Sequence, residues 1–186
     1  MKEMRFEDIL HTGKLWAVVY DGDAQDILTK TLSFWMDPLA LETFFSANRE
    51  DLASFYQITH LDQAIIDTIA DAAALASLLL DNHSTSDLNA LFLPLENSRI
   101  REMLLSREKA KGKRISHHPS WLRIYAIKLD DNIFLITGGT IKLTHKMHER
   151  KHTQIELVKM EKVRAYLLEN GIIDADGIKD YNDSEL

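Results

Sequence analysis

The clearest alternation of apolar and polar positions runs through residues 120–146 and predicts two β-strands. In the first segment, Ile124, Ala126 and Leu129 are set among polar or charged residues, and the second is rich in β-branched side chains. The sequence Asp130-Asp131-Asn132 lies between the two segments and is typical of a tight turn. We therefore expect a β-hairpin, with a bend or bulge at Gly138-Gly139 in its second strand.

The N-terminal half has a mainly helical pattern. Residues 15–20 form an apolar run that predicts a short strand, whereas residues 1–14 show no clear pattern. Asp23 is a candidate N-cap for a helix that reaches Trp35, and Asp37-Pro38 can begin a second helix. A third helix is expected over residues 62–80, with an apolar side made of Ile65, Ile66, Ile69, Ala73, Ala76 and Leu80.

The C-terminal third combines basic and acidic segments. Residues 103–106 favour an edge strand, and residues 107–114, with five basic side chains around a glycine, favour an exposed loop or strand end. The last strong helix is expected to start at Glu149 or Thr153 and to end at Asn170-Gly171. Its body-facing residues are expected to be Ile155, Val158, Val163, Tyr166 and Leu167. The acidic residues 171–186 favour a frayed tail over a segment folded back onto the basic region.

The composition fits one soluble domain. A chain of 186 residues is long enough for one ordinary core, and the absence of cysteine excludes disulfides, zinc knuckles and thiol catalysis. The sequence shows no signal peptide, and the apolar residues 64–80 contain Asp67 and Asp71, so we expect a packed helix rather than a membrane span. These features predict a cytoplasmic protein that does not bind a membrane.

The net charge of −7 conceals two regions of opposite sign. Residues 99–164 hold sixteen Lys or Arg against seven Asp or Glu, and the rest of the chain holds six against twenty-two. Such asymmetry indicates a basic functional face on an acidic body, although a fortuitously charged surface would give the same totals.

Five of the eight histidines lie in or beside this basic hairpin region, namely His117, His118, His145, His148 and His152. A metal site is one interpretation, because His148 and His152 are four residues apart, but no HExxH motif is present and the surrounding positive charge opposes a cation. Phosphate binding accounts better for mixed Arg, Lys and His. The chain has no Walker loop and no G-x-S-x-G motif, while a Ser-His-Asp site is neither indicated nor excluded. We expect no metal and no cofactor.

RNA cleavage through the 2′-hydroxyl would make use of these residue types. The reaction needs a base for the hydroxyl, cations for the charge that develops on phosphorus, and an acid for the leaving oxygen. His145, together with Arg123 and Lys142 or Lys146, would supply these groups. Basic patches also bind anions without catalysis, so the residue types alone do not distinguish RNA cleavage from simple anion binding.

The second half of the chain resembles toxins of the RelE/ParE superfamily, especially the HigB-like or phage-derived branch. Over about 80 residues, the resemblance rests on Leu93-Pro94-Leu95, the Arg-containing strand 121–125, the Asp130-Asp131 turn, the apolar run 134–136 and the basic exit 141–146. It implies an α+β fold in which helices pack on one side of a small antiparallel sheet. It also implies a toxin that cleaves messenger RNA on the ribosome and is inhibited by a cognate antitoxin, expected to be a small helix-turn-helix protein.

The resemblance places the expected elements within a single domain, residues 1–186. We assign an opening strand and helix to residues 15–36, a helical insertion in the N-terminal half to 37–82, the RelE-like sheet and last helix to 91–170, and an acidic tail to 171–186. The insertion makes this chain larger than the usual family toxin.

The expected site residues fall into two groups. The catalytic group has Arg123, Lys142 and Lys146 holding phosphate and His145 transferring a proton. Further RNA-binding side chains are expected at Arg107, Lys111, Lys113, Arg114, His148, Arg150 and Lys151. A non-catalytic interaction protein with the same fold and a basic groove is the main alternative, and a ParE-like poison of DNA topology is a third.

Overall fold

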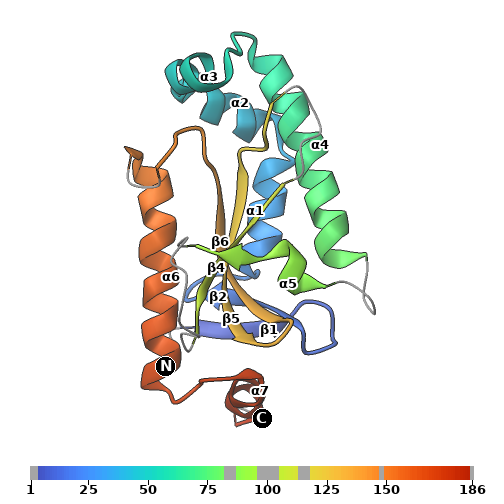
Figure 1. The fold of residues 1–186 in the computed structure, drawn as a ribbon, viewed down its shortest axis with the longest axis vertical. Helices are drawn as coiled ribbons and strands as arrows, with labels where there is room; N and C mark the ends of the chain where they lie inside the picture. The colour runs from blue at the N-terminus through green and yellow to red at the C-terminus, as the bar shows by residue number, and fades with distance from the viewer. Residues whose placement is uncertain (1–3, 82–86, 96–104, 113–117, 147–148, 185–186) are drawn as a thin grey trace.

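The chain is organised around a six-stranded sheet in the computed structural model, which describes residues 4–81, 87–95, 105–112, 118–146 and 149–184 (Figure 1). The strands are β1 (Met4–Asp8), β2 (Leu15–Tyr20), β3 (Leu93–Pro94), β4 (Arg107–Lys111), β5 (Leu122–Asp130) and β6 (Ile133–Ile141). Their order across the sheet is β1-β2-β6-β5-β4-β3. Every pair is antiparallel except β2 and β6, which run parallel. The predicted α+β class is confirmed, but the sheet is mixed rather than purely antiparallel.

The predicted hairpin is formed by β5 and β6. Asn132 in the turn has φ 56°, a left-handed conformation that asparagine tolerates better than most residues. The register of the two strands shifts between Tyr125 and Ala126, which confirms the expected irregularity beside Gly138-Gly139. A side chain at Gly138 would overlap the carboxylate of Glu156, so the absence of a Cβ lets the helix that carries Glu156 lie close to β6.

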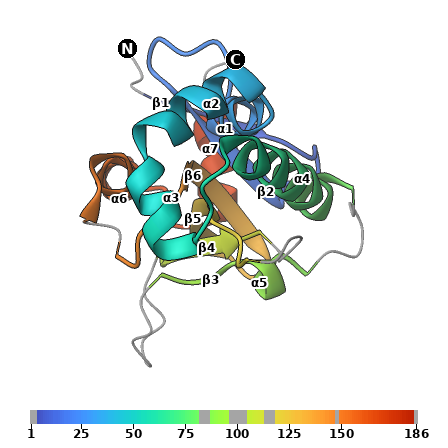
Figure 2. The same cartoon turned by 90° about the horizontal axis from the view of Figure 1, so that it is seen from above.

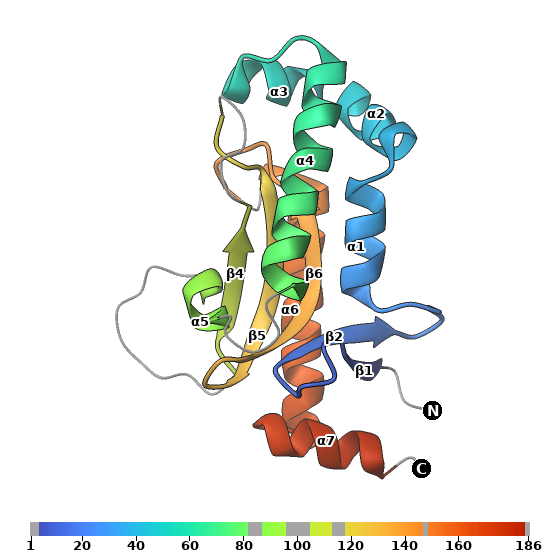
Figure 3. The ribbon, with the colours of Figure 1, turned by 90° about the vertical axis from the view of Figure 1, so that its right-hand side faces the viewer.

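Helices cover both faces of the sheet. α1 (Ile27–Trp35) and α4 (Leu61–Leu80) lie on one face and α6 (Lys151–Glu169) on the other, and Figure 3 shows α4 in front of the strands and α6 behind them. The helices are therefore not confined to one side of the sheet, contrary to what the resemblance implies. α2 (Pro38–Ala47) and α3 (Arg49–Tyr56) lie over the end of the sheet where β6 finishes (Figure 2). The short α5 (Leu88–Leu91) precedes β3, and α7 (Ala175–Asp183) packs beside β1. Several helices therefore lie in the N-terminal half, as predicted.

The core is one continuous apolar cluster between these layers. Its largest fully buried side chains are Trp35, Trp121, Tyr125, Phe45 and Phe134. They come from α1, α2, the segment before β5, and the β5–β6 hairpin, so the helical insertion shares one core with the sheet.

The first two helices have acidic N-caps, and one of these differs from the prediction. The carboxylate of Asp26, rather than that of Asp23, accepts a hydrogen bond from the backbone N–H of Thr29 at 2.9 Å and begins α1. Asp23 instead pairs with Lys30 at 2.7 Å. Asp37 caps α2 as predicted, with proline at the first helical position.

The buried side of α4 differs from the apolar side that the sequence predicts. Ile66 is 60% exposed and Ala73 is also exposed. The buried residues are Ala64, Thr68, Asp71, Ala72, Leu75 and Leu79. Apolar periodicity pointed to the wrong side because the buried side carries two polar residues, which bond to the segment before β5. By length and composition alone α4 could also cross a membrane, a criterion that core helices of soluble proteins meet as well.

The ends of the chain and the basic segment before β5 also differ from the prediction. Residues 4–8 form β1, and residues 107–111 form the strand β4 rather than an exposed loop or strand end, with Glu108 and Ala110 buried. The predicted edge strand at 103–106 lies partly outside the described residues, and residues 105 and 106 are not in a strand.

The last helix and the acidic segment after it were predicted less well than the hairpin. α6 starts at Lys151, between the two predicted starts, and ends as predicted before Asn170-Gly171. Its side toward the sheet contains Met160, Val163 and Leu167, whereas Val158 is 68% exposed. Ile155 is also exposed, so two of the five predicted body-facing residues are wrong. The acidic segment is neither frayed nor folded onto the basic region, because it forms α7, where Asn182 donates a hydrogen bond to the Phe6 carbonyl at 2.9 Å.

Candidate functional site

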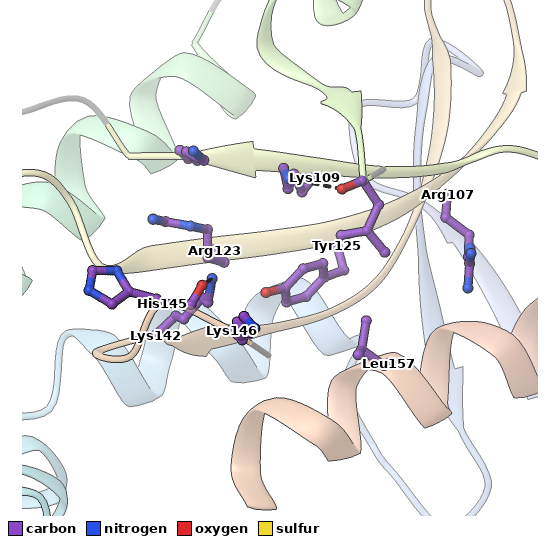
Figure 4. Close-up of a pocket in the computed structure, with 10 residues that line it drawn as sticks. Arg107, Lys109, Arg123, Tyr125, Lys142, His145, Lys146 and Leu157 are labelled. Atoms are coloured by element: carbon purple, nitrogen blue, oxygen red, sulfur yellow. Dashed lines mark hydrogen bonds between the residues drawn. The ribbon is translucent and has the colours of Figure 1, made fainter. Parts of the chain in front are cut away.

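A basic groove lies on the face of the sheet that also carries α6 (Figure 4). Its volume is about 410 Å³. The walls come from β4, β5, the segment after β6, the residue that follows β3 and one residue of α6. The lining residues are Leu95, Arg107, Lys109, Lys111, Arg123, Tyr125, Lys142, His145, Lys146 and Leu157. We call this feature the basic groove.

Strand register explains why so many of these side chains meet. Alternate residues of a strand point to the same face, and paired residues of neighbouring strands share a face. β4 and β5 pair Lys111 with Arg123 and Lys109 with Tyr125. The basic residues at positions 107, 109 and 111 therefore form a row beside Arg123 and Tyr125, and the segment leaving β6 adds Lys142, His145 and Lys146.

The positive charge of the basic groove is only partly neutralised, since Arg107 pairs with Glu161 of α6, with Nη1 and Oε2 3.5 Å apart. Its described lining holds six Lys or Arg side chains and no Asp or Glu. Lys109 donates to the Leu95 carbonyl at 3.0 Å, and Lys142 donates to the His145 carbonyl at 2.5 Å. Arg123 donates to the carbonyls of Ser120 and Leu122, both at 2.7 Å. Because these partners are neutral carbonyls, the cationic charge remains available to an anion.

Burial and mutual repulsion act on the groove lysines. Burial lowers the pKa of Lys142, and the neighbouring Arg123, Lys109 and Lys111 lower it further. Burial likewise lowers the pKa of Lys109, with added contributions from Lys111 and Arg123. A bound phosphate would counter both effects, because its negative charge favours the protonated ammonium.

Anion binding is therefore expected to weaken at a lower pH than it would for exposed lysines. Protonated Lys109 and Lys142 attract an anion, and this attraction is lost as the pH rises through their lowered pKa values, below the ordinary 10.5. Titrations of a single-stranded RNA oligomer between about pH 7 and 10 should show this decline. The Lys109→Arg/Lys142→Arg variant should not show it, because arginine stays protonated. A decline that persists in this variant would exclude these lysines as its source.

Residues of α4 hold the segment that leads into β5. The Trp121 indole N–H donates to the Thr68 hydroxyl at 2.9 Å, and the Ser120 hydroxyl donates to the Asp71 carboxylate. The Ser120 carbonyl in turn accepts from Arg123. A chain of contacts thus runs from α4 to the guanidinium group in the groove. Neither Thr68 nor Asp71 was predicted to have such a role.

The surroundings of Asp71 are tightly packed. Burial raises the pKa of the Asp71 carboxyl, and its Oδ1 atom has no hydrogen-bond partner within the described structure. A Cβ at Gly112 would overlap both Asp71 and the Ser120 hydroxyl, so only glycine leaves room for this pair. His118 extends the cluster, since its Nε2 lies 3.0 Å from an Asp67 oxygen and its ring stacks on Trp121.

The basic groove gathers six of the eleven predicted site residues. These six are Arg107, Lys111, Arg123, Lys142, His145 and Lys146. Two others do not line it: Arg150 pairs with Asp51 of α3, and Lys151 is exposed at the start of α6. The remaining three, Lys113, Arg114 and His148, lie outside the described residues.

Four lining residues were missing from the prediction, namely Leu95, Lys109, Tyr125 and Leu157. The signal for Lys109 is the alternation of basic residues at positions 107, 109 and 111, which places all three on one face only if the segment is a strand throughout. Tyr125 could have been found by its spacing of two from Arg123. Leu95 and Leu157 carried no comparable signal, because their positions depend on tertiary packing.

No match was found. Comparisons of the chain with protein-family models, with curated proteins and with solved structures gave no similar protein. The resemblance to RelE-like toxins thus stays a prediction. Among the described residues, no group of three His, Cys, Asp or Glu is placed to hold a metal. His152, considered above as a metal ligand, lies with its Nε2 3.0 Å from the Ile141 carbonyl.

Proposed function

We propose that this protein is an RNA endonuclease that holds the RNA backbone in the basic groove and acts as the toxin of a toxin–antitoxin pair. The observation that carries the proposal is the set of six Lys or Arg side chains around one groove whose described lining has no carboxylate. A concave surface with this charge attracts polyanions and contacts several phosphates at once.

The groove side chains fit cleavage through the 2′-hydroxyl. His145, which is exposed, accepts the 2′-hydroxyl proton as the 2′-oxygen attacks phosphorus. Arg123 stabilises the negative charge that develops on the phosphoryl oxygens. The bond from phosphorus to the 5′-oxygen breaks, and Lys142 protonates that oxygen, because its ammonium group lines the groove together with Arg123 and His145. The products are a 2′,3′-cyclic phosphate and a 5′-hydroxyl.

Tyr125 supports the same step without losing its own proton. Burial raises the pKa of its hydroxyl, which therefore stays protonated at neutral pH. In Figure 4 this hydroxyl points toward the end of the groove where Arg123, Lys142 and His145 lie. It can donate a hydrogen bond to a phosphoryl oxygen, whereas it cannot serve as the base.

The toxin role draws its support from the order of the elements and from the sequence resemblance. The resemblance implies a strand and a helix before the sheet and a long helix after it. In this chain β1 and β2 precede the helices α1 to α5, and β3 to β6 are followed by the long α6 and then by α7. We propose messenger RNA on the ribosome as the substrate. We also propose that a small helix-turn-helix antitoxin neutralises the protein by covering the basic groove.

A non-catalytic interaction protein is the alternative. The observation in its favour is that the described groove lining offers one imidazole and no carboxylate as a proton acceptor. Such a lining binds a polyanion even when no bond is cleaved.

Expression in a bacterial host separates these functions. The wild-type protein should arrest growth and degrade messages, whereas Arg123→Ala/Lys142→Ala should do neither, because phosphate binding and proton donation are both lost. The matched control is Lys128→Ala, since Lys128 lies on the same strand but outside the groove and 3.9 Å from Asp131. Harmless expression of the wild type without its neighbouring gene would contradict the toxin role. Intact messages with DNA damage would indicate the ParE-like alternative instead.

A further inference from the structure

The helical insertion reaches the basic groove through α3. Asp51 of α3 is buried and forms a two-pronged ion pair with Arg150, with Nε to Oδ2 at 2.7 Å and Nη2 to Oδ1 at 2.5 Å. The Tyr56 hydroxyl donates to the Lys142 carbonyl at 3.4 Å. α3 is therefore fixed on both sides of the segment that carries Lys142, His145 and Lys146 into the groove.

Between these two anchors, α3 presents an exposed aromatic ring. Phe55 is 40% exposed, and its ring meets the ring of His145 edge to face, with centroids 4.9 Å apart and an interplanar angle of 88°. His145 is itself a lining residue of the basic groove. The other large exposed aromatic residue among those described, Phe34, contacts Phe44 of α2 instead. Phe55 is thus the exposed aromatic residue that adjoins the groove.

We propose that Phe55, held against His145, forms a nucleobase-binding subsite at the α3 end of the basic groove. A single-stranded polynucleotide carries an aromatic base beside each phosphate, so a chain whose phosphates lie on the Lys and Arg row can stack a base on the neighbouring ring. Duplexes keep their bases stacked inside and cannot do this without opening. This inference rests on the proposed function, because it takes the groove to bind an RNA backbone, and it identifies the substrate as single-stranded RNA.

The anchors of α3 make this subsite rigid. A platform that is held before the ligand arrives loses less conformational entropy on binding than a mobile side chain does. The Asp51–Arg150 pair and the Tyr56 contact fix the helix on which Phe55 lies. The helical insertion therefore adds a contact with a nucleobase to a groove whose other side chains contact phosphates.

Two oligomers of equal length test the subsite, one a single-stranded RNA and the other an abasic ribose-phosphate chain. The wild type should bind the RNA about 10- to 100-fold more tightly, the range expected when one base stacks on an aromatic side chain. Phe55→Leu should remove most of that preference and leave the affinity for the abasic chain unchanged. Phe55→Trp should keep the preference, and Phe34→Leu is the matched control at an exposed aromatic residue away from the groove.

A fluorescent base analogue gives a second measurement. 2-Aminopurine in the RNA should be quenched on binding to the wild type and to Phe55→Trp, but not to Phe55→Leu. Equal affinity of the wild type for both oligomers would overturn the subsite, as would an equal loss for both in Phe55→Leu, which would show that Phe55 only positions His145. If the RNA preference holds and no cleavage occurs, the subsite stands and the nuclease proposal fails. If neither oligomer binds, both proposals fail.

Discussion

Replacing Arg123 with alanine is expected to weaken RNA binding about 10- to 150-fold, the largest effect of any single change in the basic groove. A hydrogen bond to a charged group contributes about 1.5–3 kcal/mol, which corresponds to this range. Arg123 is partly buried in the middle of the row, and neutral carbonyls from the backbone hold its guanidinium. Arg123→Lys should recover part of the affinity, because it restores the charge without the two-pronged geometry.

The salt dependence of RNA binding tests whether the affinity lost in Arg123→Ala comes from a contact with phosphate. For single-stranded RNA, the slope of log K against log salt should fall by about 0.7 for each phosphate contact removed. Lys30→Ala is the matched control, because Lys30 lies on α1, on the opposite face of the sheet, and pairs with Asp23. If Arg123→Ala keeps both the affinity and the salt slope of the wild type, Arg123 does not contact phosphate.

Replacing Trp121 with alanine is expected to lower the free energy of unfolding by about 3–5 kcal/mol, as for other large-to-small changes in a core. The indole is fully buried, with ring centroids 5.6 Å from Phe45, 5.0 Å from Tyr56 and 4.0 Å from His118. It also bonds to Thr68. One side chain therefore joins α2, α3 and α4 to the start of β5.

Urea unfolding measures this decrease in the free energy of unfolding, and two further variants serve for comparison. Trp121→Phe should lose less than Trp121→Ala, because it keeps most of the apolar area and gives up the bond to Thr68. Leu39→Ala, at an exposed position on α2, should stay within about 0.5 kcal/mol of the wild type. An unfolding midpoint for Trp121→Ala that equals that of the wild type would show that the insertion does not share a core with the sheet.

The hairpin was predictable because its signals are local. Alternation, β-branched residues and the Asp-Asp-Asn turn all act within residues 120–146 and agree with one another. The cluster of Arg123, Lys142, His145 and Lys146 followed from the same local structure. Local signals do not show which strands pair with each other. Neither segment contains a signal for the parallel pairing of β2 with β6.

Buried polar residues explain why the wrong sides of α4 and α6 were expected to face the core. Thr68 and Asp71 made the buried side of α4 look like its solvent side, because apolar periodicity assumes that polar groups are exposed. Glu156 had the same effect on α6: it is buried against Gly138, and burial raises the pKa of its carboxyl. Arg150 lies in a basic segment of the sequence and was therefore expected to bind RNA. Its ion-pair partner Asp51 lies 99 residues earlier, so no local signal in the sequence indicates this pair.

The parallel pairing of β2 with β6 limits when the sheet can form during synthesis of the chain. Residues 15–17 pair with residues 134–136, so the first of these strands must wait while more than 100 further residues are made. Closing so long a loop costs entropy and slows folding. Lys142, His145 and Lys146 are made later still, so an unfinished chain emerging from the ribosome has no assembled basic groove.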